Sequence, residues 1–378
     1  MRNEYRVCAR CVMDTTAQEI EFDDQGVCNF CRDFDVHVAR ILATTEEELA
    51  SRFRELVAEI KSKGKGQPFD SVVGLSGGTD SSYLCHLCAD AGLRPLVVTV
   101  DTGWDSPESA ENIRRLSAKL PFEFRTVAVD WEEMRDLQVA YYKAAVQNCE
   151  VPQDHVFLAI LYEQAAKTKV RSLLTGGNLA TESILPASWS FNAADLRNLK
   201  AIHRRFGTKP LQRFQTLPFW KRYAYYPFVR GIREMRLLNF VPYNRREAKR
   251  LLEDEYGWQD YGPKHYESIL TRFFQAYVLL KRFGIDKRRA HFSSLIVSGQ
   301  MDRDEALRLL EAPPYPNEEL LEEDMAHIAQ KLDLSLEEWK GILALPPRAH
   351  TEFPSSQWLF SLKDTMVRGL GVRRRWWG

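Results

Sequence analysis

The sequence predicts an α/β fold: a doubly wound parallel sheet, with a zinc-ribbon module before it and a helical region after it. Apolar strand patterns alternate with helix patterns from residue 70 onward, and only helix patterns follow residue 245. Near the start of the chain, four cysteines form two pairs with the spacing of metal ligands. Strands separated by helices imply right-handed parallel crossovers. The predicted regions are 1–40, 41–200 and 201–378.

The composition favours a folded protein without a membrane span. Apolar residues make up 44% and aromatic residues 11% of the 378 residues, enough to form a core and to argue against disorder. No signal-peptide stretch and no run of about 18 apolar residues occurs, so we expect a cytoplasmic protein. Lys plus Arg (52) equals Asp plus Glu (52), so net charge indicates no particular partner.

The first module carries two CxxC pairs separated by sixteen residues, Cys8/Cys11 and Cys28/Cys31. This spacing is typical of a tetrathiolate zinc site, and four sulfur ligands predict a closed, structural one. An iron–sulfur cluster is the alternative that the spacing leaves open. A third pair, Cys85 and Cys88, lies within a predicted helix and is interpreted as core packing.

The elements follow in order along the chain. A polar helix is predicted over 44–63, where Thr45 and Glu48 form a capping-box pattern. A turn at 64–68 precedes the sheet. The predicted strands are 71–75, 95–101, 122–129 and 170–176. The predicted helices are 81–91, 106–120, 154–169, 245–255, 264–283, 286–297, 302–311, 317–332 and 335–344.

The most informative motif, SGGTDSS, lies between the first strand and its helix. Backbone N–H groups and the positive helix end suit a phosphate there, and adjacent glycines allow its close approach. Hydroxyls add donors, and Asp80 makes sense as a magnesium ligand. The predicted phosphate-binding residues are Ser76, Gly77, Gly78, Thr79, Asp80, Ser81 and Ser82. The motif lacks the Gly-Lys-Ser/Thr of a Walker A loop.

SGGTDSS resembles the signature of the PP-loop, or N-type, ATP pyrophosphatases. The resemblance implies cleavage of ATP between its α and β phosphates, an adenylated intermediate, and displacement of AMP by a nucleophile that is often ammonia. It also implies that the adenine lies at the end of the second strand, Val100 and Asp101. Thr175, Gly176 and Gly177 resemble the later nucleotide-facing loop of the class, with Glu182 as a magnesium ligand.

A basic, aromatic stretch runs from His203 to Arg250, with 13 Lys or Arg and two acidic residues. Such a stretch is compatible with nucleic acid, with a nucleotide diphosphate sugar, or with a solvated face. The tail, residues 373–377, is also basic and aromatic, and we expect a frayed terminus there.

Several segments together resemble the N-acetyl sugar amidotransferase family of surface-polysaccharide biosynthesis, over nearly the whole chain. They are CARCVMDTT (8–16), GVCNFC (26–31), GPKHYESILTR (262–272), GIDKRRAH (284–291) and SGQM (298–301). The resemblance implies that ATP and Mg²⁺ activate the acetamido oxygen of a UDP-linked N-acetyl sugar, and that ammonia then forms an acetamidino group. Lys264 and Arg272 are the catalytic cations expected from it, and His265 and Glu267 are candidates to orient the substrate or move protons; a helix histidine without a role is the alternative for His265.

No glutaminase nucleophile motif is recognisable in the sequence. The resemblance therefore implies ammonia from separate glutaminase and cyclase-like subunits, and no nucleic-acid partner is expected. Two other functions are weighed: a PP-loop tRNA-modifying enzyme of the thiolation type, and a zinc-ribbon binding module on an inactive nucleotide fold. The intact SGGTDSS opposes the second, and the positions of Cys85, Cys88 and Cys149 oppose the first.

Overall fold

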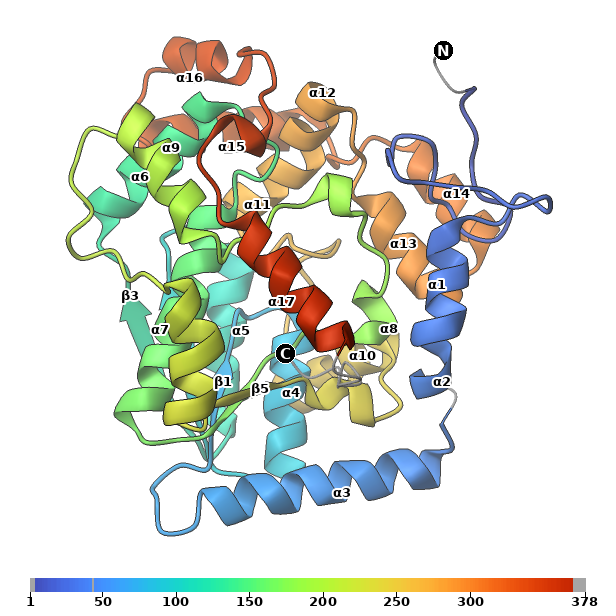
Figure 1. Ribbon diagram of the computed structural model, residues 1–378, viewed down its shortest axis with the longest axis vertical. Coiled ribbons are helices and arrows are strands. Elements are labelled where there is room, and N and C mark those ends of the chain that lie inside the picture. The colour runs from blue at the N-terminus through green and yellow to red at the C-terminus, as the bar shows by residue number, and fades with distance from the viewer. Residues whose placement is uncertain (1–3, 43, 370–378) are drawn as a thin grey trace.

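The computed structural model describes residues 4–42 and 44–369 and is built on a five-stranded, wholly parallel sheet (Figure 1). The strand order is β3-β2-β1-β4-β5, so the chain adds strands to one side and then to the other, which confirms the doubly wound fold. The strands are β1 (Ser71–Gly74), β2 (Pro95–Asp101), β3 (Glu123–Ala128), β4 (Ser172–Leu174) and β5 (Arg233–Met235). The tail 373–377 lies outside the described residues.

Both faces of the sheet are buried, because successive strand residues point to opposite faces and are apolar on each face. Val72, Leu96 and Val98 face a core formed with helices α6, α7 and α9. Val73 and Val97 face a second core formed with α3, α4 and α10. Helices on both faces are what the near-continuous apolar strands require.

Most predicted helices are present within a few residues of their predicted bounds. Thr45 caps the first long helix by accepting from the Glu48 N–H, which is half of the predicted capping box. The helices are α1 (Asn29–His37), α2 (Ala39–Leu42), α3 (Glu46–Lys63), α4 (Thr79–Asp90), α5 (Pro107–Lys119), α6 (Trp131–Ala144), α7 (Val151–Lys167), α8 (Leu179–Glu182), α9 (Leu196–Phe206), α10 (Arg245–Tyr256), α11 (Ile269–Phe273), α12 (Leu279–Phe283), α13 (Arg288–Val297), α14 (Arg303–Glu311), α15 (Glu318–Lys331), α16 (Leu336–Leu343) and α17 (Gln357–Gly369). None of the described helices is long and apolar enough to cross a bilayer.

The predicted helix over 264–283 is wrong at its start. Residues 264–268 form a loop in which His265 has φ 71°, and the helix begins only after Ser268, whose side chain accepts from the Thr271 N–H. A π-helical turn, Phe274–Val278, then separates α11 from α12. The loop that ends at this capping serine carries Lys264.

The cysteine module packs against the C-terminal helices rather than against the sheet (Figure 1). The Val12 N–H donates to Ser293 Oγ on α13, and Arg289 of the same helix donates to the Val12 carbonyl. Arg303, at the start of α14, donates to the carbonyls of Cys8 and Cys11. The two ends of the chain therefore form one unit. The domain boundary at residue 200 stays a prediction, although β5 from beyond it completes the sheet.

A buried carboxylate holds the loop after α9 against α6. Glu133 is 8% exposed and accepts from the backbone N–H groups of Gln212, Arg213 and Phe214 at 2.8–2.9 Å.

Because truncation of Glu133 would leave these donors unsatisfied, we expect Glu133→Ala to lower the free energy of unfolding by about 3 kcal/mol in urea titrations. Glu132→Ala is the matched control: its exposed ion pairs on the same helix predict a loss below about 1 kcal/mol. Equal losses in the two variants would contradict this assignment.

Candidate functional site

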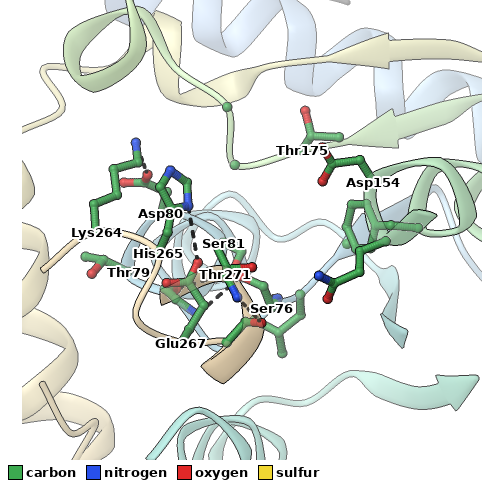
Figure 2. A pocket seen from close by; sticks show the side chains of 18 of the residues that line it. Ser76, Thr79, Asp80, Ser81, Asp154, Thr175, Lys264, His265, Glu267 and Thr271 are labelled. Atoms are coloured by element: carbon green, nitrogen blue, oxygen red, sulfur yellow. Dashed lines mark hydrogen bonds and ion pairs between the residues drawn. The ribbon is translucent and has the colours of Figure 1, made fainter. Parts of the chain in front are cut away.

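A cavity of about 450 Å³ opens at the carboxyl ends of β1 and β4, where the strand order reverses. Thirteen of the predicted site residues line it: Ser76, Gly78, Thr79, Asp80, Ser81, Val100, Thr175, Gly176, Gly177, Glu182, Lys264, His265 and Glu267. Figure 2 shows Lys264, Asp80 and His265 on one side of this cavity and Asp154 on the other. Parallel α/β sheets bind their ligands at this location.

The phosphate loop of SGGTDSS (residues 76–82) is a tight turn that ends at the start of α4. Gly77 has φ 74°, and a Cβ there would lie 2.5 Å from Ser109 Oγ, so only glycine fits. The Ser76 N–H donates to Ser81 Oγ at 3.1 Å, which closes the turn. The buried hydroxyl of Thr79 has no partner among the described residues, and its donor is free for a ligand oxygen.

Lys264 lies over the phosphate loop and joins two carboxylates. Its Nζ is 3.2 Å from Asp80 Oδ2, 2.8 Å from Glu182 Oε1 and 3.0 Å from Thr181 Oγ1. Burial lowers the pKa of Lys264, but Asp80 and Glu182 outweigh it and hold the pKa above its ordinary value. The side chain is therefore a permanent cation at neutral pH.

Asp80 is ionised by the same arrangement. Burial raises the pKa of its carboxyl, but Lys264, Arg245 and a hydrogen bond donated by Tyr243 together bring the pKa below its ordinary value. A buried aspartate kept charged beside a phosphate loop has the chemistry of a hard-cation ligand.

The loop after β4 (residues 175–178) lies directly against the phosphate loop. A Cβ on Gly176 would meet Ser81 N at 2.9 Å, so glycine allows the close approach of the two loops. Asn178 caps α8 by accepting from the Thr181 N–H, which fixes Glu182 at the end of that helix. A Cβ on Gly177 would lie 3.3 Å from the guanidinium of Arg236, a cation that the sequence did not single out.

Further carboxyl groups line the cavity besides Asp80 and Glu182. Asp105 has its pKa raised to about 7, first by burial and then by the charges of Asp101 and Glu267. Burial raises the pKa of Glu267, but His265, 3.8 Å away, and Lys264 together bring it below its ordinary value. Glu150 and Asp154, from the start of α7, also line the cavity.

Arg245 is the largest omission of the sequence analysis. It lines the cavity, and its Nε and Nη2 atoms are buried without a hydrogen-bond partner among the described residues. Two adjacent free donors of one guanidinium form the fork that binds phosphate or carboxylate oxygens. In the sequence, Arg245 stands out only as one of the 13 Lys or Arg residues of the stretch 203–250.

Four predicted site residues do not line the cavity. Arg272 binds both oxygens of Asp324 at 2.7 and 2.8 Å, outside the cavity lining. The Asp101 carboxylate accepts from the Gly103 N–H and does not line the cavity. Gly77 and Ser82 belong to the phosphate loop but are buried away from the cavity lining.

The four cysteines of the first module form a closed cluster. Cys8, Cys11, Cys28 and Cys31 are fully buried, and their sulfur atoms lie within 4.8 Å of one another. Adjacent Sγ atoms are 3.7–3.9 Å apart, and a tetrahedral ion with metal–sulfur bonds of about 2.3 Å requires about 3.8 Å. The cluster can therefore hold one metal ion. A multi-iron cluster would interpose iron and sulfide and keep the thiolates farther apart. The thiols of Cys85, Cys88 and Cys149 are also buried, but in apolar cores.

Comparison with known proteins identifies the C-terminal part. Residues 267–366 match the family model of the "LPS biosynthesis protein WbpG-like, C-terminal domain", in agreement with the predicted resemblance to a surface-polysaccharide family. No curated protein sequence gives a significant match.

Two solved structures are similar to parts of this chain at low identity. The NMN synthetase from Francisella tularensis is 15% identical with a TM-score of 0.27, over 36% of this chain and 56% of that chain. The chain thus spans just over half of that synthetase. The U34-tRNA thiolase NcsA from Methanococcus maripaludis, solved with its 4Fe-4S cluster, is 14% identical with a TM-score of 0.32, over 70% of this chain and 81% of that chain.

The cysteine cluster predicts one bound metal ion per chain. We expect elemental analysis of the purified protein to give about one equivalent, and Cys8→Ser to reduce it, because an incomplete thiolate set binds metal more weakly. Metal removal is expected to lower the unfolding temperature, since the cluster holds α13 and α14. Cys85→Ser, a buried thiol outside the cluster, should retain the metal; loss of metal in both variants would contradict the assignment.

The raised pKa of Asp105 predicts a pH-dependent stability. Its folded-state pKa of about 7 exceeds the ordinary 3.8, so ionisation costs folding energy that appears as pH rises from about 4 to about 7. Asp101, Glu267 and Lys331 are the charged groups that face it. We expect Asp105→Asn to become progressively more stable than the parent across this range in thermal unfolding, with a constant difference above it. Asp254→Asn, an exposed carboxyl on α10, should show no such trend; a pH-independent difference for Asp105→Asn would contradict the assignment.

Proposed function

We propose that the chain is an ATP-dependent amidotransferase that converts an acetamido group of a UDP-linked N-acetyl sugar into an acetamidino group. The observation that carries this is the phosphate loop at the switch point of the sheet, with Lys264 fixed over it by Asp80 and Glu182. The C-terminal match to a lipopolysaccharide-biosynthesis family supports a sugar substrate. The proposed location is the cytoplasm, where ATP is available.

The chain's own residues hold the nucleotide in this proposal. The free hydroxyl of Thr79 binds a phosphate oxygen, and the positive end of α4 attracts the β and γ phosphates. Lys264 neutralises the pyrophosphate as it leaves. Val100, at the end of β2, faces the adenine.

The chemistry has two balanced steps. The acetamido oxygen attacks the α phosphorus, the bond from that phosphorus to the oxygen bridging to the β phosphorus breaks, and pyrophosphate departs. The amide N–H proton is lost to water, which gives an O-adenylyl imidate. Ammonia then adds to the imidate carbon, the C–O bond breaks, AMP departs with the electron pair, and an amidine remains. An amide oxygen is a poor leaving group, and adenylylation turns it into a good one. His265 and Glu267 are placed to move the proton that ammonia loses.

Magnesium fits the residues present. Asp80 and Glu182 are two carboxylates at the phosphate loop, and Mg²⁺ in nucleotide sites takes one or two carboxylates together with phosphate oxygens and water. When bound, it supplies charge neutralisation on the phosphates. Zinc is the proposed ion of the cysteine cluster, with a structural role, because all four ligand positions are filled by sulfur.

Ammonia is proposed to come from separate glutaminase and cyclase-like subunits. The tRNA-thiolation alternative gains no support from the cysteines outside the cluster, because all three are buried in apolar cores and none lines the cavity. An exposed, reactive thiolate would be needed to carry sulfur.

The function is tested by incubating the chain with ATP, Mg²⁺, ammonium and candidate UDP-acetamido sugars. We expect AMP, pyrophosphate and a sugar product about one mass unit lighter, as replacement of oxygen by NH requires. Lys264→Met should reduce turnover about a hundredfold or more, because it removes the cation over the leaving group. Lys249→Met is the control, since Lys249 forms a comparable ion pair with Asp260 outside the cavity. Turnover with glutamine alone would refute the separate source of ammonia, and equal loss in both variants would refute the role of Lys264. Absence of AMP and pyrophosphate release with every sugar nucleotide would refute the function itself.

A further inference from the structure

A second chamber adjoins the first, and we propose that it is the acceptor site, which takes a nucleoside diphosphate-linked acetamido sugar with its diphosphate at the junction of the two chambers. The substrate class rests on the proposed function; the location does not. The chamber measures about 400 Å³, within the roughly 300–1,000 Å³ of small-molecule sites.

Three basic side chains lie at the junction between the two chambers. Arg245, Lys264 and Lys287 line both chambers together with Gln275, and Lys287 faces the carboxyl groups of Glu150, Asp154 and Glu182. Lys264 is already paired with Asp80 and Glu182. The buried Nε and Nη2 of Arg245 are unpaired in the described part of the chain, and leaving donors of a charged group buried without acceptors is costly. An anion at the junction removes that cost.

The walls of the second chamber are apolar and rigid. Phe292 and Leu295, three residues apart on α13, lie on the same side of that helix and line the chamber together. Pro313 and Pro314 line it from the loop after α14, and the Tyr266 hydroxyl donates to the Pro314 carbonyl at 2.6 Å, which fixes this loop. Flat aromatic and proline faces suit the ring faces of a sugar or a base.

The segments that form the walls of the second chamber favour an acceptor-binding site rather than a second ATP-binding site. Most lining residues fall within 267–366, the segment that matches the lipopolysaccharide-biosynthesis domain, whereas the phosphate loop comes from the sheet. The chamber contains no second glycine loop at a strand end in the described residues. The charge and shape of the second chamber therefore fit the diphosphate and the ring groups of a sugar nucleotide. The chamber lies next to the place where the α phosphorus of ATP would lie.

The proposal predicts separate effects on the two ligands. Leu309 lines the chamber and is 44% exposed, so Leu309→Trp narrows the chamber without disturbing a core. Leu336→Trp is the matched control, 43% exposed on α16 and outside both chambers. Binding is measured by calorimetry on the full chain loaded with a non-hydrolysable ATP analogue and Mg²⁺, with UDP-N-acetylglucosamine, UDP and N-acetylglucosamine as probes.

We expect UDP-N-acetylglucosamine and UDP to bind the loaded parent chain, and Leu309→Trp to weaken both by at least about tenfold. The affinity for the ATP analogue should stay unchanged, and Leu336→Trp should match the parent for every ligand. No binding of any probe to the loaded parent, equal binding to Leu309→Trp, or equal weakening of the ATP analogue would overturn the proposal.

The assay also separates this inference from the proposed reaction. If Leu309→Trp loses probe binding but the parent forms no amidine, the acceptor site stands and the amidotransferase function fails. If the parent forms amidine and Leu309→Trp does so with an unchanged KM for the sugar nucleotide, the function stands and the location of the acceptor fails. A thermal shift that shows Leu309→Trp folded like the parent excludes misfolding as the cause.

Discussion

The contact of Lys264 with Asp80 and Glu182 is the interaction on which the arrangement of the site depends. It joins three segments that are distant in sequence: the loop after β1, the short helix α8 after β4, and the loop before α11. Lys264 and Asp80, whose side chains are 10% and 16% exposed, would be expensive to hold there without an opposite charge. The ion pairs therefore link the loop before α11 to the carboxyl end of the sheet. Lys264 itself lines both chambers.

The sequence predicted the parts of the structure whose signals are local. Strands β1 to β4 and the glycine loops follow from apolar runs and adjacent glycines, which are properties of a few consecutive residues. Strand β5 was missed because its three residues include Arg233 and Glu234 and carry no apolar run. The pairing of Arg272 with Asp324 was not predicted because Asp324 lies 52 residues away, and pairing over that separation leaves no pattern in the sequence. Arg245 reaches the cavity for the same kind of reason, through tertiary packing of α10.

The cysteine module influences the site without contributing to its lining. Its backbone is bonded to Ser293 and Arg289 of α13 and to Arg303 of α14, and α13 carries Phe292 and Leu295 into the second chamber. A tetrahedral thiolate cluster has little freedom to deform, so it gives these helices a rigid support. This explains why a module of some forty residues at one end of the chain is packed against helices from the other end.

The first chamber contains both basic side chains and carboxyl groups, and the proposed reaction gives each a role. A site built only for triphosphate would gain affinity by omitting Asp105, Glu150 and Asp154, since a charged carboxylate repels phosphate. Burial raises the pKa of Asp105 and of Asp154 to about 7, so these carboxyl groups are only partly charged at neutral pH. The proposed reaction turns a neutral amide into an amidine, which is a strong base and positively charged in water. In that reaction Lys264 stabilises the departing pyrophosphate, while the ionised carboxyl groups stabilise the positive charge that develops on the sugar.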